Sequence, residues 1–118
     1  MTHIKTYTDK QYACKITYII TSNIEVEITK WYKRNKLKLE EFILDSEGVV
    51  LFETISHYTL IIDENCLSYN TINHELFHLT REIAVPRGIH EDESQAWIMG
   101  NVSQQLYNFI NSKNLKIK

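Results

Sequence analysis

The stretch of sequence that decides the fold is SYNTINHELFHLTREIAVPRG, which covers residues 68–88. Its apolar residues recur at about 100° per residue, the period of an α-helix, at Ile72, Leu76, Leu79 and Ile83. Pro86 and Gly88 then follow, and this pair is typical of the end of a helix. The stretch therefore predicts one amphipathic helix, which begins near Ser68 and buries its apolar side.

The segments on either side of this helix predict a strand-rich first half and a second long helix. Short runs of β-branched and aromatic residues predict strands, at residues 15–21, 42–44, 49–52 and 58–63. Helical spacing predicts further helices at residues 23–35 and 91–111. We therefore expect an α+β fold in a single domain: a small, mostly antiparallel sheet with a helix, followed by the amphipathic helix and a long C-terminal helix.

The composition limits the partners that we expect. Apolar residues make up 43% and charged residues 24% of the chain, and the formal net charge is -2. The chain has no excess of positive charge, no signal-peptide stretch and no apolar run near the roughly 20 residues that span a bilayer. We expect a cytoplasmic protein with no nucleic-acid or membrane partner, and we interpret the basic and aromatic stretch at residues 30–38 as a solvated helix face and loop.

The amphipathic helix contains the motif His-Glu-x-x-His at residues 74–78. Residues four apart lie one turn from each other on the same helical face, so the imidazoles of His74 and His78 can converge on one ion. Neutral imidazole is a good zinc ligand. Glu75 projects to one side, where it can reach a water on the metal without taking a metal position. The motif therefore predicts zinc ligands at His74 and His78 and a general base at Glu75.

A catalytic zinc needs a third protein ligand and an open position for water. Metzincins take this ligand from a histidine six residues after the second motif histidine, where this chain has Ala84, so that class is excluded. The remaining candidates lie at the start of the last helix. We favour Glu93, followed by Glu91 or His90, because the small residues on the same side of the helix as Glu93 would let the two helices pack closely.

The pattern of His-Glu-x-x-His on one helix and Glu-x-x-Ala at residues 93–96 on the next resembles the gluzincin-type metallopeptidases. Within that class it is similar to the minimal ImmA/IrrE-like proteins and to small phage-encoded peptidases, over residues 71–109. The resemblance implies a zincin-like fold in which His74, His78 and Glu93 hold a zinc ion and Glu75 activates water. It also implies a peptide or protein substrate, cleaved by metal-assisted hydrolysis.

In zincin-like folds the substrate lies antiparallel to an edge strand of the sheet. We expect this strand at residues 58–63, immediately before the motif helix, with Tyr58, Leu60 and Ile62 against the substrate. The sequence thus predicts a zinc-dependent metallopeptidase with Glu75 as general base. The alternative is a zincin-like domain that binds a metal, is catalytically idle, and serves a structural or protein-interaction role.

Overall fold

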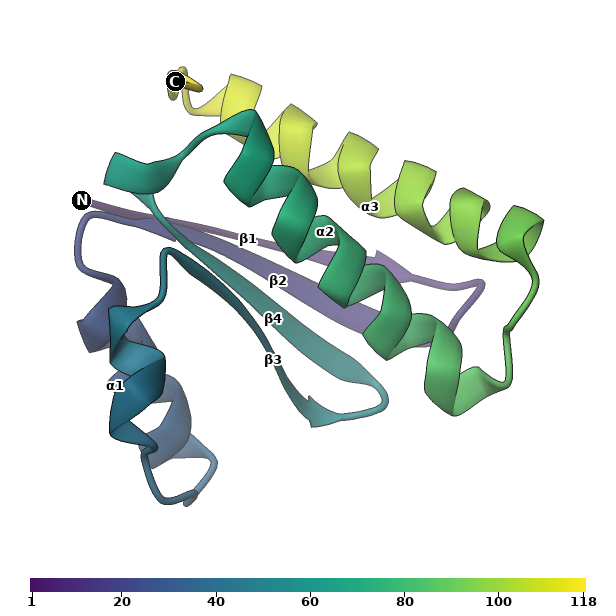
Figure 1. Cartoon of the computed structure of the whole chain (residues 1–118), viewed down its shortest axis with the longest axis horizontal. Coiled ribbons are helices and arrows are strands. Elements are labelled where there is room, and N and C mark those ends of the chain that lie inside the picture. The colour runs from purple at the N-terminus through teal and green to yellow at the C-terminus, as the bar shows by residue number, and fades with distance from the viewer.

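The computed structural model describes all residues from Met1 to Lys118 and shows an α+β fold (Figure 1). The strands and helices follow in the order β1 (Thr2–Asp9), β2 (Cys14–Thr21), α1 (Ile24–Arg34), β3 (Gly48–Thr54), β4 (His57–Asp63), α2 (Tyr69–Ala84) and α3 (Asp92–Ser112). Short 3-10 helices cover Glu41–Asp45, Glu64–Cys66 and Val85–Arg87. None of the helices is long and apolar enough to cross a bilayer.

The four strands form one mixed sheet in the order β1-β2-β4-β3. β1 pairs antiparallel with β2 and β3 pairs antiparallel with β4, whereas the central pair of β2 and β4 is parallel. The central pair is parallel because the chain leaves β2 through α1 and returns to the middle of the sheet by way of the β3–β4 hairpin. The two edge strands are therefore β1 and β3.

The sheet has an apolar face on each side because side chains alternate along its strands. Every second residue of β2, from Cys14 to Ile20, faces α2 and α3 and belongs to the main core. Ile19 faces the other way and packs in a smaller core against Ile28 and Trp31 of α1. Figure 1 shows α2 and α3 side by side in front of the sheet. The motif helix is thus held by the main core on one side, and its other side is exposed.

The structure confirms the three predicted helices and three of the four predicted strands. The helices begin and end within a residue of the predicted positions, and the strands at 15–21, 49–52 and 58–63 correspond to β2, β3 and β4. The predicted strand at residues 42–44 is wrong. Residues 42–44 lie in a 3-10 helix, and β3 instead forms a hairpin with β4 through a turn at Ile55 and Ser56.

The predicted substrate strand is also wrong, because β4 is not at an edge. It lies between β2 and β3 and is hydrogen-bonded on both sides. Tyr58, Leu60 and Ile62 are fully buried in the main core, so these side chains cannot contact a substrate. Five consecutive residues of β4 are buried, which is the pattern of a central strand covered on both faces. The free edge on the α2 side of the sheet is β3.

Candidate metal centre

The motif helix begins and ends where its sequence requires. The Ser68 hydroxyl accepts a hydrogen bond from the Thr71 backbone amide at 3.1 Å, which caps the N-terminus of α2. Beyond the other end, Gly88 has a φ of 68°, a left-handed conformation that favours glycine. These two features set where the helix begins and where the chain turns after it, and the packing of its apolar side in the main core orients the motif residues relative to the sheet.

The structure brings the two motif histidines together. The Nε2 atoms of His74 and His78 lie 3.1 Å apart, and their ring centroids are 4.7 Å apart. Both residues are exposed, and the side chain of His74 has a relative exposure of 65%. Apart from each other, the imidazoles have no hydrogen-bond partner in the protein. The pair is therefore open to a shared ligand from solvent.

The separation of these nitrogen atoms fits a shared zinc ion. Zinc–nitrogen bonds are about 2.0–2.1 Å long, so two nitrogens on a tetrahedral zinc lie about 3.3 Å apart. The observed Nε2–Nε2 distance of 3.1 Å is close to this value. His74 and His78 therefore fit the role of two zinc ligands.

Glu75 lies beside the histidine pair in a much more buried position. Its relative exposure is 6%, and its Oε2 atom lies 4.0 Å from Nε2 of His74. Burial raises the pKa of Glu75, while the neighbouring His74 and His78 lower it. No protein group donates a hydrogen bond to the carboxylate. A largely buried carboxylate that lines a groove beside two imidazoles is typical of a functional group.

Gly48, the first residue of β3, makes room for this carboxylate. A Cβ atom at position 48 would lie 2.8 Å from Cγ of Glu75 and 3.2 Å from its Cδ and Oε2 atoms. A side chain at position 48 would therefore displace Glu75. The sequence reasoning missed this role. The only local signal for it is a glycine directly before the apolar run at residues 49–52.

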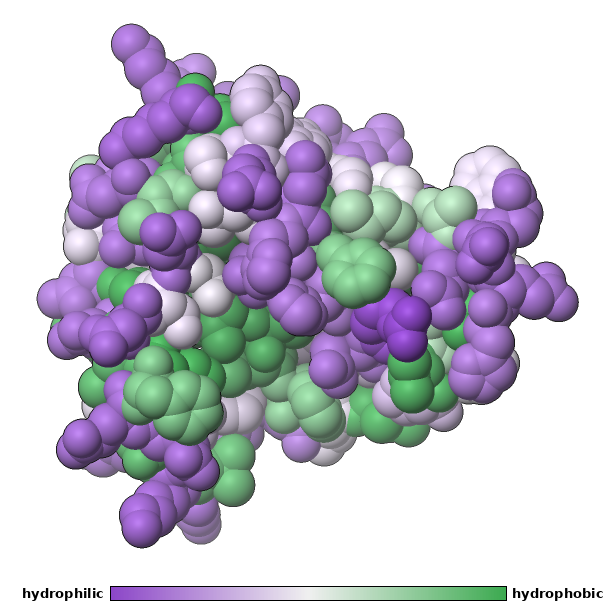
Figure 2. Space-filling model, in the orientation of Figure 1, coloured by the Kyte–Doolittle hydropathy of each residue, from purple (hydrophilic) through white to green (hydrophobic).

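A groove between β3 and α2 contains the whole motif. One part, of about 280 Å³, is lined by Gly48, Val49, Val50, His74, Glu75, His78 and Glu82. A second part, of about 290 Å³, is lined by Ser46, Glu47, Gly48, Asn70, Thr71, His74 and Glu75. Because the two parts share three residues, they form one continuous groove. Figure 2 shows hydrophobic surface on this face of the molecule, in the region where Figure 1 places β3.

The packing of α3 against α2 determines which residues lie opposite the histidines. Thr80 donates a hydrogen bond to Sδ of Met99 at 3.2 Å, and the Tyr107 hydroxyl donates one to Oδ1 of Asn73 at 3.2 Å. These contacts show that the two helices run antiparallel. The middle of α3 therefore lies opposite the motif, and the first turn of α3 lies near the C-terminal end of α2.

For this reason the structure does not bring Glu93 to the histidine pair. Glu93 and the alternatives Glu91 and His90 are all exposed at the start of α3, and none of them lines the groove. No group of three or more His, Cys, Asp or Glu side chains is arranged to hold a metal ion. The structure thus assembles His74, His78 and Glu75, and leaves the predicted third ligand apart from them.

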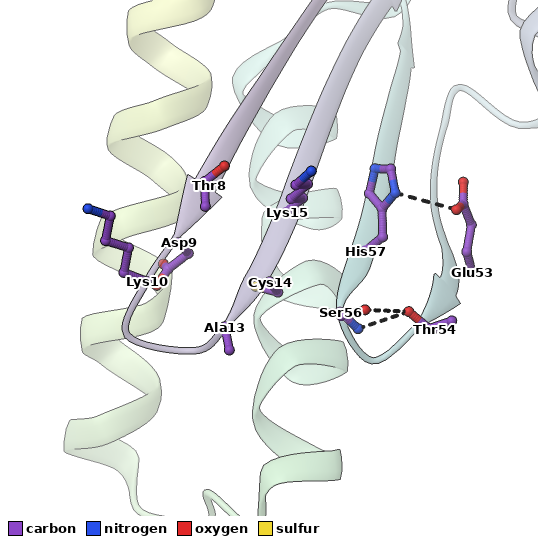
Figure 3. A pocket seen from close by; sticks show the side chains of 10 residues that line it. All are labelled: Thr8, Asp9, Lys10, Ala13, Cys14, Lys15, Glu53, Thr54, Ser56 and His57. Carbon is purple, nitrogen blue, oxygen red and sulfur yellow. Dashed lines mark hydrogen bonds and ion pairs between the residues drawn. The ribbon is translucent and has the colours of Figure 1, made fainter.

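A larger cavity, of about 490 Å³, lies where β3 ends and β4 begins (Figure 3). Its histidine, His57, already has a partner at each ring nitrogen: Nδ1 lies 3.4 Å from Oε2 of Glu53, and Nε2 lies 3.1 Å from Oγ1 of Thr17. His57 also alternates with the buried Tyr58 and so faces away from α2. We therefore place the candidate metal centre at the β3–α2 groove and not at this cavity.

Comparisons with known proteins give no match, whether to protein-family models, curated proteins or solved structures. The resemblance to gluzincin-type metallopeptidases is therefore a prediction from the motif residues, and the function has to be argued from the site itself.

Proposed function

We propose that the protein is a zinc-dependent metallopeptidase whose active site is the groove between β3 and α2. The observation that carries this proposal is a pair of imidazole nitrogens 3.1 Å apart beside a buried carboxylate that has no hydrogen-bond donor in the protein. The free edge of β3 borders the same groove. We place the activity in the cytoplasm, since both cysteines are free thiols and such thiols persist in a reducing compartment.

In this proposal each motif residue has one role. His74 and His78 would hold a zinc ion through their Nε2 atoms, and no third protein ligand lies beside them. A bound zinc ion supplies Lewis-acid chemistry, which polarises a peptide carbonyl and makes water a stronger acid. Glu75 accepts the proton of the attacking water on its carboxylate and returns it to the leaving amine.

The substrate would be an extended peptide on the free edge of β3. The main chain of an edge strand can pair with an added strand through hydrogen bonds that do not depend on sequence. Gly48 lies at the start of this edge and directly against Glu75. A peptide paired with β3 would therefore pass the carboxylate and the histidine pair. β3 takes the role that the sequence assigned to β4.

The test is the variant Glu75→Gln in the zinc-loaded protein. Glutamine keeps the shape of the side chain but cannot act as a base, so zinc content should stay the same while hydrolysis of a fluorescence-quenched peptide falls by about 100-fold or more. His74→Ala should lose zinc, and His3→Ala, in β1 and outside the groove, should not. Hydrolysis by Glu75→Gln at the wild-type rate would refute the proposal.

A second measurement concerns the third ligand. The positions of the side chains predict that Glu93→Gln keeps its zinc, because Glu93 lies outside the groove. Loss of zinc in this variant, measured by elemental analysis, would show that the start of α3 moves to the histidine pair when the metal binds.

One observation favours the second candidate, a metal-binding module without catalysis. Only two histidines converge, and no third metal-ligating side chain joins them. For such a module Glu75→Gln should change neither zinc content nor any measured activity. The same variant therefore separates the two functions, provided that wild-type hydrolysis is measured alongside it.

A further inference from the structure

We propose that the groove selects cationic peptides, with Glu47 and Glu82 each binding a lysine or arginine side chain on opposite sides of the histidine pair. This inference rests on the proposed function, because it takes the groove as the place where a peptide substrate lies. It adds the chemical class of the substrate and the two residues that recognise it.

The charges that line the groove all have one sign. Its carboxylates are Glu47, Glu75 and Glu82, and no lysine or arginine lines either part. Neither Glu47 nor Glu82 belongs to an ion pair within the protein. A divalent cation held by neutral imidazoles would place its two positive charges at the centre of the groove beside Glu75, whereas Glu47 and Glu82 line its opposite ends. The uncompensated charge lies at its two ends.

Glu75 gives an independent sign that the groove receives a ligand. This side chain is more than nine-tenths buried, lines both parts of the groove and accepts no hydrogen bond from the protein. Glu47, in contrast, accepts a hydrogen bond from Oγ1 of Thr71 at 3.3 Å, which fixes it beside the N-terminal half of α2. The groove thus has an unpartnered group at its centre and a positioned carboxylate at one end.

The spacing of the two outer carboxylates suits an extended peptide. Thr71, which holds Glu47, and Glu82 are eleven residues apart on α2, which corresponds to about 16 Å along the helix axis at about 1.5 Å per residue. A β-strand covers the same distance with about five residues, at about 3.3 Å each. A basic side chain two or three residues to either side of the scissile bond would therefore reach Glu82 or Glu47.

The experiment compares three fluorescence-labelled peptides that differ only at the two flanking positions, which carry lysine, glutamine or glutamate. Binding is measured by fluorescence anisotropy with the zinc-loaded Glu75→Gln variant, because this variant should bind a peptide without cleaving it. The specificity constant kcat/KM is measured with the zinc-loaded wild type. We expect each outer carboxylate to strengthen binding of the lysine peptide by about fivefold relative to the glutamine peptide. The glutamate peptide should bind most weakly of the three. The preference should weaken as salt is raised.

Two variants test the assigned residues. In the same background, Glu47→Gln and Glu82→Gln should each reduce the preference for lysine by about fivefold, and the double substitution should remove it. Glu25→Gln is the matched control, because it removes one negative charge from α1 on the other face of the sheet and should leave the preference unchanged.

The outcomes separate this inference from the proposed function. If the wild type cleaves all three peptides equally well, the inference is wrong and the peptidase assignment stands. If no peptide is cleaved but the lysine peptide still binds through Glu47 and Glu82, the peptidase assignment is wrong and the inference stands. If no peptide binds and none is cleaved, both are wrong.

Discussion

The contact between Gly48 and Glu75 predicts that Gly48→Ala reduces catalysis without removing the metal. The added Cβ atom would lie 2.8 Å from Cγ of Glu75, whereas carbon atoms in contact are normally about 3.5–4.0 Å apart. One of the two side chains must therefore move by about 0.7 Å or more. The side chain of Glu75 can rotate, so we expect its carboxylate to be displaced from the histidine pair.

The size of the effect follows from this displacement. A misplacement of about 1 Å can reduce catalysis by about 100-fold, so kcat for a fluorescence-quenched peptide should fall by about 10- to 100-fold. Zinc content should not change, because the substitution does not touch His74 or His78. The φ of Gly48 is not positive, so alanine introduces no backbone strain, and the free energy of unfolding in urea should change by about 1 kcal/mol or less.

The matched control for this prediction is Gly100→Ala. A Cβ atom at position 100 of α3 would meet nothing within 4 Å. Alanine also favours the helix by about 0.5–1 kcal/mol over glycine, so this variant should be slightly more stable and fully active. If Gly48→Ala keeps its fold, its zinc and its wild-type kcat, Glu75 does not act as a base from the position described, and the reasoning fails.

Three further predictions concern stability. Arg87 donates hydrogen bonds to the backbone carbonyls of Tyr12, in the β1–β2 turn, at 2.7 Å and of Ile55, in the β3–β4 turn, at 2.6 Å. Arg87→Met should therefore reduce the free energy of unfolding by about 3 kcal/mol. A loss of less than about 1 kcal/mol, measured by urea unfolding, would contradict this role. Trp31 has a buried indole N–H without a hydrogen-bond partner. Trp31→Phe removes this unsatisfied donor, so the free energy of unfolding should change by about 1 kcal/mol or less. Trp31→Ala leaves a cavity and should reduce the free energy of unfolding by about 3–5 kcal/mol. Burial raises the pKa of Tyr18, whose hydroxyl donates to Oε1 of Gln105 at 2.8 Å. The unfolded chain releases the phenol proton at about pH 10 while the folded protein keeps it, so stability should fall as pH rises above that value, and this fall should be smaller in Tyr18→Phe.

The helices could be predicted from the sequence because their signals are local. The apolar spacing of α2 and the breaker residues that follow it decide its length without reference to the rest of the chain. The sheet was harder to predict because its order depends on distant segments. β1 is an edge strand with mostly exposed residues, so it lacks the apolar run that marks β2 and β4. The apolar run at 42–44 resembled a strand but lies in a 3-10 helix beside α1.

The difference between local signals and signals from distant segments also explains which site residues could be predicted. The convergence of His74 and His78 depends only on the geometry of one helix, and the sequence predicts it directly. The role of Gly48 depends on which strand lies beside α2, and the position of Glu93 depends on how α3 packs against it. Neither relation is contained in a short motif. The sequence therefore identified the two imidazoles and the neighbouring carboxylate, and not the strand edge that borders them.

In the proposed site the peptide lies along β3 and not along β4, and this changes which features of a peptide the site could recognise. A central strand such as β4 could have offered only buried apolar side chains, and these are already used by the core. β3 offers an unpaired main chain next to Glu75, and the residues around it include Glu47 and Glu82. A main-chain edge binds extended peptides of any sequence, so in the proposed peptidase discrimination between peptides would come from these flanking charges. In the proposed peptidase, the strand order of the sheet would therefore link the position of the general base to the charge of the substrate.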